Sequence, residues 1–111
     1  MKIKFLLLVL FFSHPAFSNY KLETVLDDLD DAWSIVFLSE DKILFTEMPG
    51  KLKLASLSDK SITEVTDLPT VQYSGQGGLS DVALDPDFES NNTIYLSYSA
   101  KNQNKKTTLF L

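Results

Sequence analysis

The stretch SDVALDPD at residues 80–87 lines up with SIVFLSED at residues 34–41. Each copy is followed by a second matching segment, KILFT at residues 42–46 and TIYLS at residues 93–97. These segments alternate along the chain and are rich in β-branched and aromatic residues, as half-buried strands are. The copies are offset by 46 to 51 residues, which is the size of a four-stranded propeller blade. The repeat therefore predicts β-propeller blades.

A third strand-like segment follows each copy, at residues 51–57 and 107–111. Turn-forming residues separate the segments, and no stretch shows a convincing helical pattern. We therefore predict an all-β fold for residues 19–111. Two patterned copies also fit an antiparallel β-sandwich, so the pattern leaves that architecture open.

A propeller needs about 4 to 8 blades to close, and residues 19–111 hold enough strands for roughly two by the same rule. The chain also ends in the apolar segment TTLFL at residues 107–111. A sheet edge of this kind tends to pair with further chain. We therefore expect residues 19–111 to be the N-terminal part of a larger, truncated propeller domain.

Residues 1–18 have the features of a secretory signal peptide. Lys2 and Lys4 precede an apolar run at residues 5–12, and the segment AFS at residues 16–18 supplies a small-x-small cleavage site. The run is too short to span a bilayer, which takes roughly 20 apolar residues, so we expect no stable membrane anchor. Cleavage after Ser18 would place the mature protein in the periplasm or outside the cell.

The composition excludes several classes of site. The net charge is −5 at pH 7 and there is no Cys, which argues against nucleic-acid binding and rules out a disulfide framework. All ten basic residues are Lys. The single His, His14, lies inside the predicted signal peptide. The mature chain therefore carries no residue that we predict to be catalytic, and no residue that we predict to bind a metal.

A glycine-rich loop, GQGG at residues 75–78, stands directly before the second copy of the repeat. Glycine permits positive φ and lets the backbone approach a ligand closely. Gln76 offers two donors and an acceptor in a loop without bulky neighbours. The loop lacks the Lys-Ser/Thr and the following helix of a phosphate loop. Composition alone fits a tight turn into a strand equally well.

The string GQGGL at residues 75–79, continued by DPDF at 85–88 and NTIYLSY at 92–98, resembles the glucose/sorbosone dehydrogenase family. Residues 33–38 (WSIVFL) and 44–47 (LFTE) resemble the first blade of that family, in the same order. The family includes soluble aldose sugar dehydrogenases that use pyrroloquinoline quinone (PQQ). Ala32 replaces a usual Pro, and the turn at residues 39–41 also departs from the family pattern.

The resemblance implies a six-bladed β-propeller of which this chain holds about the first two blades. It implies PQQ and calcium as cofactors, an aldose sugar as substrate, hydride transfer to the quinone, and an external electron acceptor. Of the family's site residues Gln76 alone has a counterpart here, as a contact to the cofactor or the sugar. A non-enzymatic sugar- or protein-binding propeller, and a propeller lactonase, are the alternative functions.

Two further segments carry structural expectations. Trp33 alternates with Ile35 and Phe37, and we predict that it packs into the core. The acidic run at residues 27–31 lacks the glycine and glutamate positions of an EF-hand loop. We interpret that run as a solvated connector that precedes the first blade.

Overall fold

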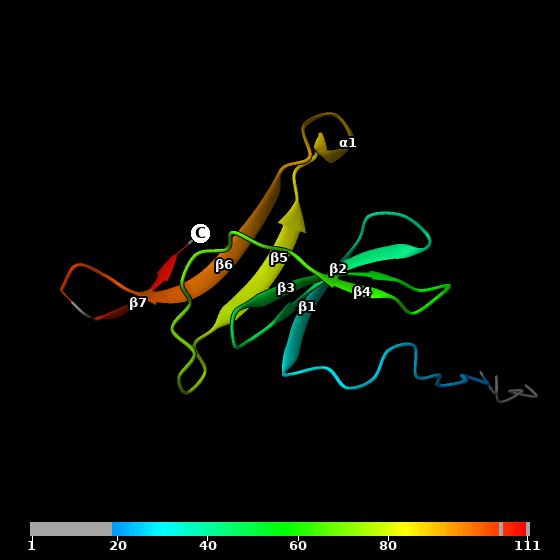
Figure 1. Cartoon of the computed structure of the whole chain (residues 1–111), viewed down its shortest axis with the longest axis horizontal. Helices are drawn as coiled ribbons and strands as arrows, with labels where there is room; N and C mark the ends of the chain where they lie inside the picture. Colours follow the sequence, from blue (N-terminus) through cyan, green and yellow to red (C-terminus); the bar gives the residue numbers. More distant parts are fainter. Residues whose placement is uncertain (1–18, 105, 111) are drawn as a thin grey trace, which may run out of the picture.

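The computed structural model describes residues 19–104 and 106–110 (Figure 1). The predicted signal peptide, residues 1–18, lies outside the described residues. Two antiparallel sheets make up the fold, in the strand orders β1-β2-β3-β4 and β5-β6-β7. The elements are β1 Ala32–Phe37, β2 Lys42–Glu47, β3 Lys51–Ser56, β4 Ile62–Glu64, β5 Leu79–Leu84, α1 Phe88–Asn91, β6 Ile94–Lys101 and β7 Thr107–Phe110.

The prediction of an all-β fold is confirmed, and six of the strands fall on the predicted segments. Two elements were not predicted. Strand β4 has three residues and all are exposed, so it carries no apolar alternation. The expectation of no helix was wrong at α1, a single turn of four residues that is too short to show a helical period. Within the described ranges, no helix is long and apolar enough to cross a membrane.

The repeat extends to the irregularities of the strands. The register of β1 against β2 shifts between Ala32 and Ile35, and that of β5 against β6 shifts between Leu79 and Val82. Such a bulge leaves a backbone N–H without its ladder partner. In each sheet a hydroxyl on the neighbouring strand accepts that N–H, and the two bonds are Ser34 N to Thr46 Oγ1 at 3.1 Å and Asp81 N to Ser97 Oγ at 2.9 Å.

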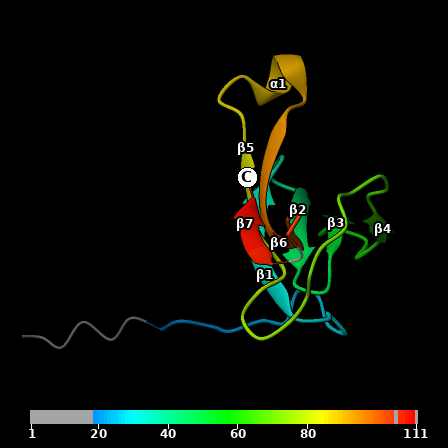
Figure 2. The same ribbon diagram turned by 90° about the vertical axis from the view of Figure 1, so that its left-hand side faces the viewer.

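The larger of two core clusters lies between the two sheets, where β5 packs against β1 and β2. Figure 2 shows β4 at the outer end of the first sheet, away from β5. The buried side chains between the sheets are Leu44, Leu52, Leu79 and Val82. Thr46 is also fully buried there, and its Oγ1 donates to the Ser80 carbonyl at 2.6 Å. The Val82 N–H on β5 also donates to Ser34 Oγ on β1 at 3.3 Å. Apolar packing and several directional hydrogen bonds therefore join the sheets.

The prediction that Trp33 packs into the core is wrong. The Trp33 side chain is 63% exposed, and Ile35 and Phe37 on the same row of β1 are also exposed. It is the other row, with Val36, that packs against the second sheet. Both rows of β1 are largely apolar, as in a strand meant to be covered on both faces. Alternation therefore could not decide which row faces the core.

Candidate functional site

Gln76 lies at the tip of a two-residue turn. Ser74 and Gly77 exchange backbone hydrogen bonds, with N to O distances of 3.1 and 3.0 Å, and Gly75 and Gln76 form the connection. Gly75 has φ = +61°, at the first central position, which type II′ turns reserve for glycine. The Gln76 side chain is exposed, and no other described residue hydrogen-bonds to it. Its amide is therefore free to contact a ligand.

The other two glycines of the loop meet steric limits. The expected positive φ occurs in this loop at Gly75, so Gly77 and Gly78 need a different reason. A Cβ on Gly77 would stand 3.0 Å from Ser99 Oγ, and a Cβ on Gly78 would stand 2.3 Å from the Met48 carbonyl oxygen. The Leu79 N–H donates to that same oxygen at 3.0 Å. Gly78 therefore lies where the backbone before β5 passes too close to Met48 for a Cβ to fit.

The turn borders an open hollow of about 570 Å³, which we name the Gln76 hollow. Figure 1 shows why distant segments meet here, since the starts of β1 and β5 lie on the same side of the molecule. The described residues that line it are Asp31, Ala32, Trp33, Met48, Tyr73, Gly75 and Gln76. The volume is within the range of small-molecule sites. Aromatic, amide and carboxylate groups therefore share one concave surface.

Tyr73 and Asp31 are joined across the Gln76 hollow, where the Tyr73 hydroxyl donates to Asp31 Oδ2. This hydrogen bond raises the pKa of the Tyr73 phenol, with smaller contributions from burial and from the charges of Asp31 and Asp30. The hydrogen bond therefore favours the protonated form of Tyr73, which donates to Asp31. The interpretation of residues 27–31 as a solvated connector is incomplete, because Asp31 also lines the Gln76 hollow.

A buried ion pair lies directly behind Asp31. Glu47 is fully buried, and Lys53 Nζ lies 2.8 Å from each of its carboxylate oxygens. Oε1 accepts hydrogen bonds from Lys53 Nζ and, at 3.0 Å, from the Asp30 N–H, whereas within the described ranges Oε2 has the ionic contact alone. Burial raises the pKa of Glu47, but these donors and the charges of Lys53 and Lys51 together hold it below 4.5. Glu47 is therefore an anion that anchors the chain at Asp30.

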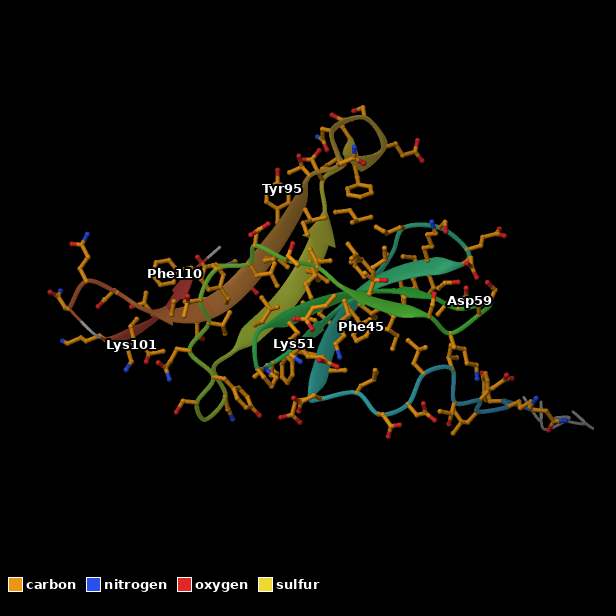
Figure 3. All side chains as sticks on the ribbon, viewed as in Figure 1. Phe45, Lys51, Asp59, Tyr95, Lys101 and Phe110 are labelled. Atoms are coloured by element: carbon orange, nitrogen blue, oxygen red, sulfur yellow. The ribbon has the colours of Figure 1, made fainter. Side chains whose placement is uncertain are left out.

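The far end of β5 carries a different polar cluster. Asp85 accepts hydrogen bonds from Tyr95 Oη at 2.7 Å and from Asn91 Nδ2 and the Asp87 N–H at 2.9 Å. These donors, that of Tyr95 foremost, lower the pKa of Asp85. Figure 3 shows Tyr95 beside α1, away from the loop that carries Gln76. The cluster closes the β5–β6 connection, and no group of three or more potential metal ligands lies together among the described residues.

The comparison with known families decides the assignment. A model described as "Glucose / Sorbosone dehydrogenase" matches residues 29–111. The chain belongs to this glucose/sorbosone dehydrogenase family. It is 37% identical over 86 residues to the aldose sugar dehydrogenase YliI of Escherichia coli strain K12, a match that covers 77% of this chain and 23% of that protein. The chain therefore spans about a quarter of the length of this relative.

Solved structures of aldose sugar dehydrogenases agree with the fold. The soluble aldose sugar dehydrogenase of Escherichia coli in its apo-form superposes with a TM-score of 0.72 at 35% identity, over 78% of this chain and 25% of that one. The PQQ-bound aldose sugar dehydrogenase of Streptomyces coelicolor superposes with a TM-score of 0.65 at 24% identity, over 78% and 29%. The neighbours are β-propellers, so the predicted propeller fold is confirmed and the sandwich is set aside.

The sequence predicts Gln76 as a site residue, but it gives no sign of the side chains that lie beside Gln76 in the structure. Asp31 and Tyr73 are 42 residues apart, and nothing in either local segment predicts that they meet. Glu47 has a signal in the neighbouring sequence. It ends an apolar strand, and the alternating Lys51 and Lys53 of the next strand segment offer cations at the matching spacing.

Proposed function

We propose that the protein carrying this chain oxidises aldose sugars with PQQ as the hydride acceptor. In this proposal the chain supplies the first blade and part of the second blade of a six-bladed propeller. Calcium is proposed with PQQ on the family resemblance alone. A sugar substrate and an external electron acceptor complete the reaction. The catalytic base is not proposed among residues 19–111.

The observation that carries this proposal is the placement of Gln76. Its exposed amide stands at a glycine-bounded tip beside a hollow of about 570 Å³, in a chain that belongs to a family of sugar dehydrogenases. An amide offers donors and an acceptor, so Gln76 suits a quinone oxygen or a sugar hydroxyl. When bound, PQQ supplies the redox chemistry that the side chains of this chain lack. The part of Gln76 is to hold and orient the bound molecules.

Replacing Gln76 by alanine should weaken binding and spare folding. An exposed loop amide supports no core, whereas an unmade hydrogen bond at a desolvated site costs about 1–3 kcal/mol. The measurement is a PQQ titration together with aldose oxidation, followed by reduction of a soluble dye, on the complete gene product. Gln103→Ala is the matched control, because Gln103 is also exposed but lies in the β6–β7 turn.

Two results would contradict these assignments. Unchanged PQQ affinity and kinetics in Gln76→Ala would leave the loop as a structural turn. If the complete gene product binds sugars and never oxidises an aldose in the presence of PQQ and calcium, it is a non-enzymatic sugar-binding propeller. Hydrolysis of a lactone in place of aldose oxidation would favour the lactonase alternative.

Export is a separate proposal. We expect residues 1–18 to be removed, so that the mature protein begins at Asn19 in the periplasm or the medium. N-terminal sequencing and intact mass of the exported protein test this prediction. A mature protein that still starts at Met1 would overturn it.

A further inference from the structure

Two aromatic side chains stand exposed at the Gln76 hollow. Trp33 at the start of β1 is 63% exposed, and Tyr73 in the loop that precedes β5 is 45% exposed. Within the described ranges the stacked aromatic pair is Tyr98–Phe110, with ring centroids 5.5 Å apart. Among the described residues the rings of Trp33 and Tyr73 are therefore unstacked, and both line the Gln76 hollow.

Tyr73 is held in position by Asp31, and Asp31 is itself fixed by backbone contacts with the first sheet. Asp31 adopts a left-handed conformation with φ = +49°, which aspartate tolerates better than most residues. Its carbonyl accepts the Met48 N–H at 3.0 Å, and the Asp30 N–H beside it is bound by the buried Glu47. The Asp31 carboxylate then fixes the Tyr73 hydroxyl. These contacts preorganise Tyr73 before any ligand arrives.

The charge of the hollow selects between kinds of ligand. Asp31 carries the only charge among the described residues that line it. A carboxylate without a neighbouring cation in the lining disfavours anionic groups. Hydroxyl groups, by contrast, can donate to Asp31 and both donate to and accept from Gln76. The lining therefore suits a neutral molecule with an apolar face and a hydroxyl-rich edge.

We infer that Trp33 and Tyr73 form a wall against which a neutral pyranose ring packs beside Gln76. The C–H face of such a ring lies on the aromatic faces, and its hydroxyls reach Asp31 and Gln76. Asp31 also acts as a positioning residue, because it holds Tyr73 in place. This inference rests on the proposed function for its substrate class, and it adds two residues that determine how the sugar is bound.

The test measures binding of methyl β-D-glucoside, which has no free anomeric hydroxyl and so is not oxidised at that carbon. Calorimetry on the complete gene product should show the Kd rising about tenfold in Trp33→Ala and in Tyr73→Ala, from the loss of one aromatic contact each. Tyr73→Phe keeps the ring and loses the Asp31 bond, so its Kd should rise about threefold. The Kd for PQQ should stay unchanged in all three.

Tyr95→Phe is the matched control, because the Tyr95 hydroxyl also donates to an aspartate, Asp85, but at the other end of β5. Its glucoside Kd should equal that of the wild type. Unchanged glucoside binding in Tyr73→Ala overturns the inference, and that variant carries the test if Trp33→Ala lowers the Tm. If the wild type never oxidises glucose but its glucoside binding still depends on Trp33 and Tyr73, the proposed activity is wrong and the inferred sugar-binding role of these two residues is upheld.

Discussion

Replacing Gly78 by alanine is expected to lower the free energy of unfolding by at least about 3 kcal/mol, the upper range for forcing an atom into a filled interior. The added Cβ would stand 2.3 Å from the Met48 carbonyl oxygen and 3.1 Å from its carbon. These are backbone atoms, so no rotamer change relieves the contact. Moving Met48 away would also break its hydrogen bond from the Leu79 N–H. The start of β5 would have to move away from the end of β2 at Met48.

Gly75→Ala is the control for the backbone alone. Gly75 has φ = +61°, and a Cβ at this position would meet open space, with nothing within 4 Å. Its cost is the left-handed conformation of an alanine, about 1–2 kcal/mol. Urea unfolding of both variants of the complete gene product makes the comparison. Equal losses for Gly75→Ala and Gly78→Ala would mean that steric closeness at Met48 is not what requires glycine.

Replacing Lys53 by methionine is the second large perturbation. It leaves the carboxylate of Glu47, which is fully buried, without its cation. Breaking a buried pair in this way costs about 3–5 kcal/mol at neutral pH. Lys51→Met is the matched control. Lys51 pairs with Glu64 at 3.8 Å, and the two side chains are 47% and 55% exposed, so its loss should stay below about 1 kcal/mol.

The pH dependence of the Lys53→Met effect has a definite sign. In the wild type the folded-state pKa of Glu47 lies below its ordinary value of 4.5. The stability from this depressed pKa is therefore present above pH 4.5 and is lost as pH falls through the folded-state pKa. In Lys53→Met, burial without the cation raises the pKa of Glu47. Lowering the pH therefore protonates Glu47 and removes the unpaired buried charge that destabilises the variant.

The difference in stability between the wild type and Lys53→Met should therefore shrink between about pH 7 and about pH 4. Urea unfolding of the complete gene product at both pH values measures it. A difference that grows on acidification would show that Glu47 is not the group responsible. If Lys53→Met and Lys51→Met lower the free energy of unfolding equally at neutral pH, burial of the Glu47–Lys53 pair does not contribute to the effect.

The strands were predictable because their information is local. Alternation and turn residues mark β1, β2, β3, β5, β6 and β7, and the repeat aligns the two sheets. The choice of face in β1 was not predictable, since the rows that contain Trp33 and Val36 are both apolar and only the neighbouring sheet distinguishes them. Local pattern therefore gives the elements, and packing decides which of their faces is covered.

The candidate site also combines a part that local sequence predicts and a part that only packing creates. The loop tip at Gln76 could be predicted because glycine marks it in the sequence. Its wall could not, because Asp31 meets Tyr73 only after β1 and β5 have been brought side by side. The burial of Glu47 was not predictable from its own position, since a glutamate at a strand end usually reaches solvent, and the only sign of its charge pairing is the alternating Lys51 and Lys53 of the next strand. Residues that act through distant partners have no signature of their own in a single sequence.

The hydroxyl of Thr46 bears on the fidelity of assembly. Units of similar sequence can associate with the wrong neighbour while they fold, and apolar surfaces alone discriminate poorly between such partners. Thr46 accepts an N–H from its own sheet at Ser34 and donates to the next sheet at Ser80. A misplaced neighbour would leave this buried hydroxyl without an acceptor, which is costly. The hydroxyl of Thr46 therefore favours docking of the second sheet on the first in the register that places the Ser80 carbonyl beside it.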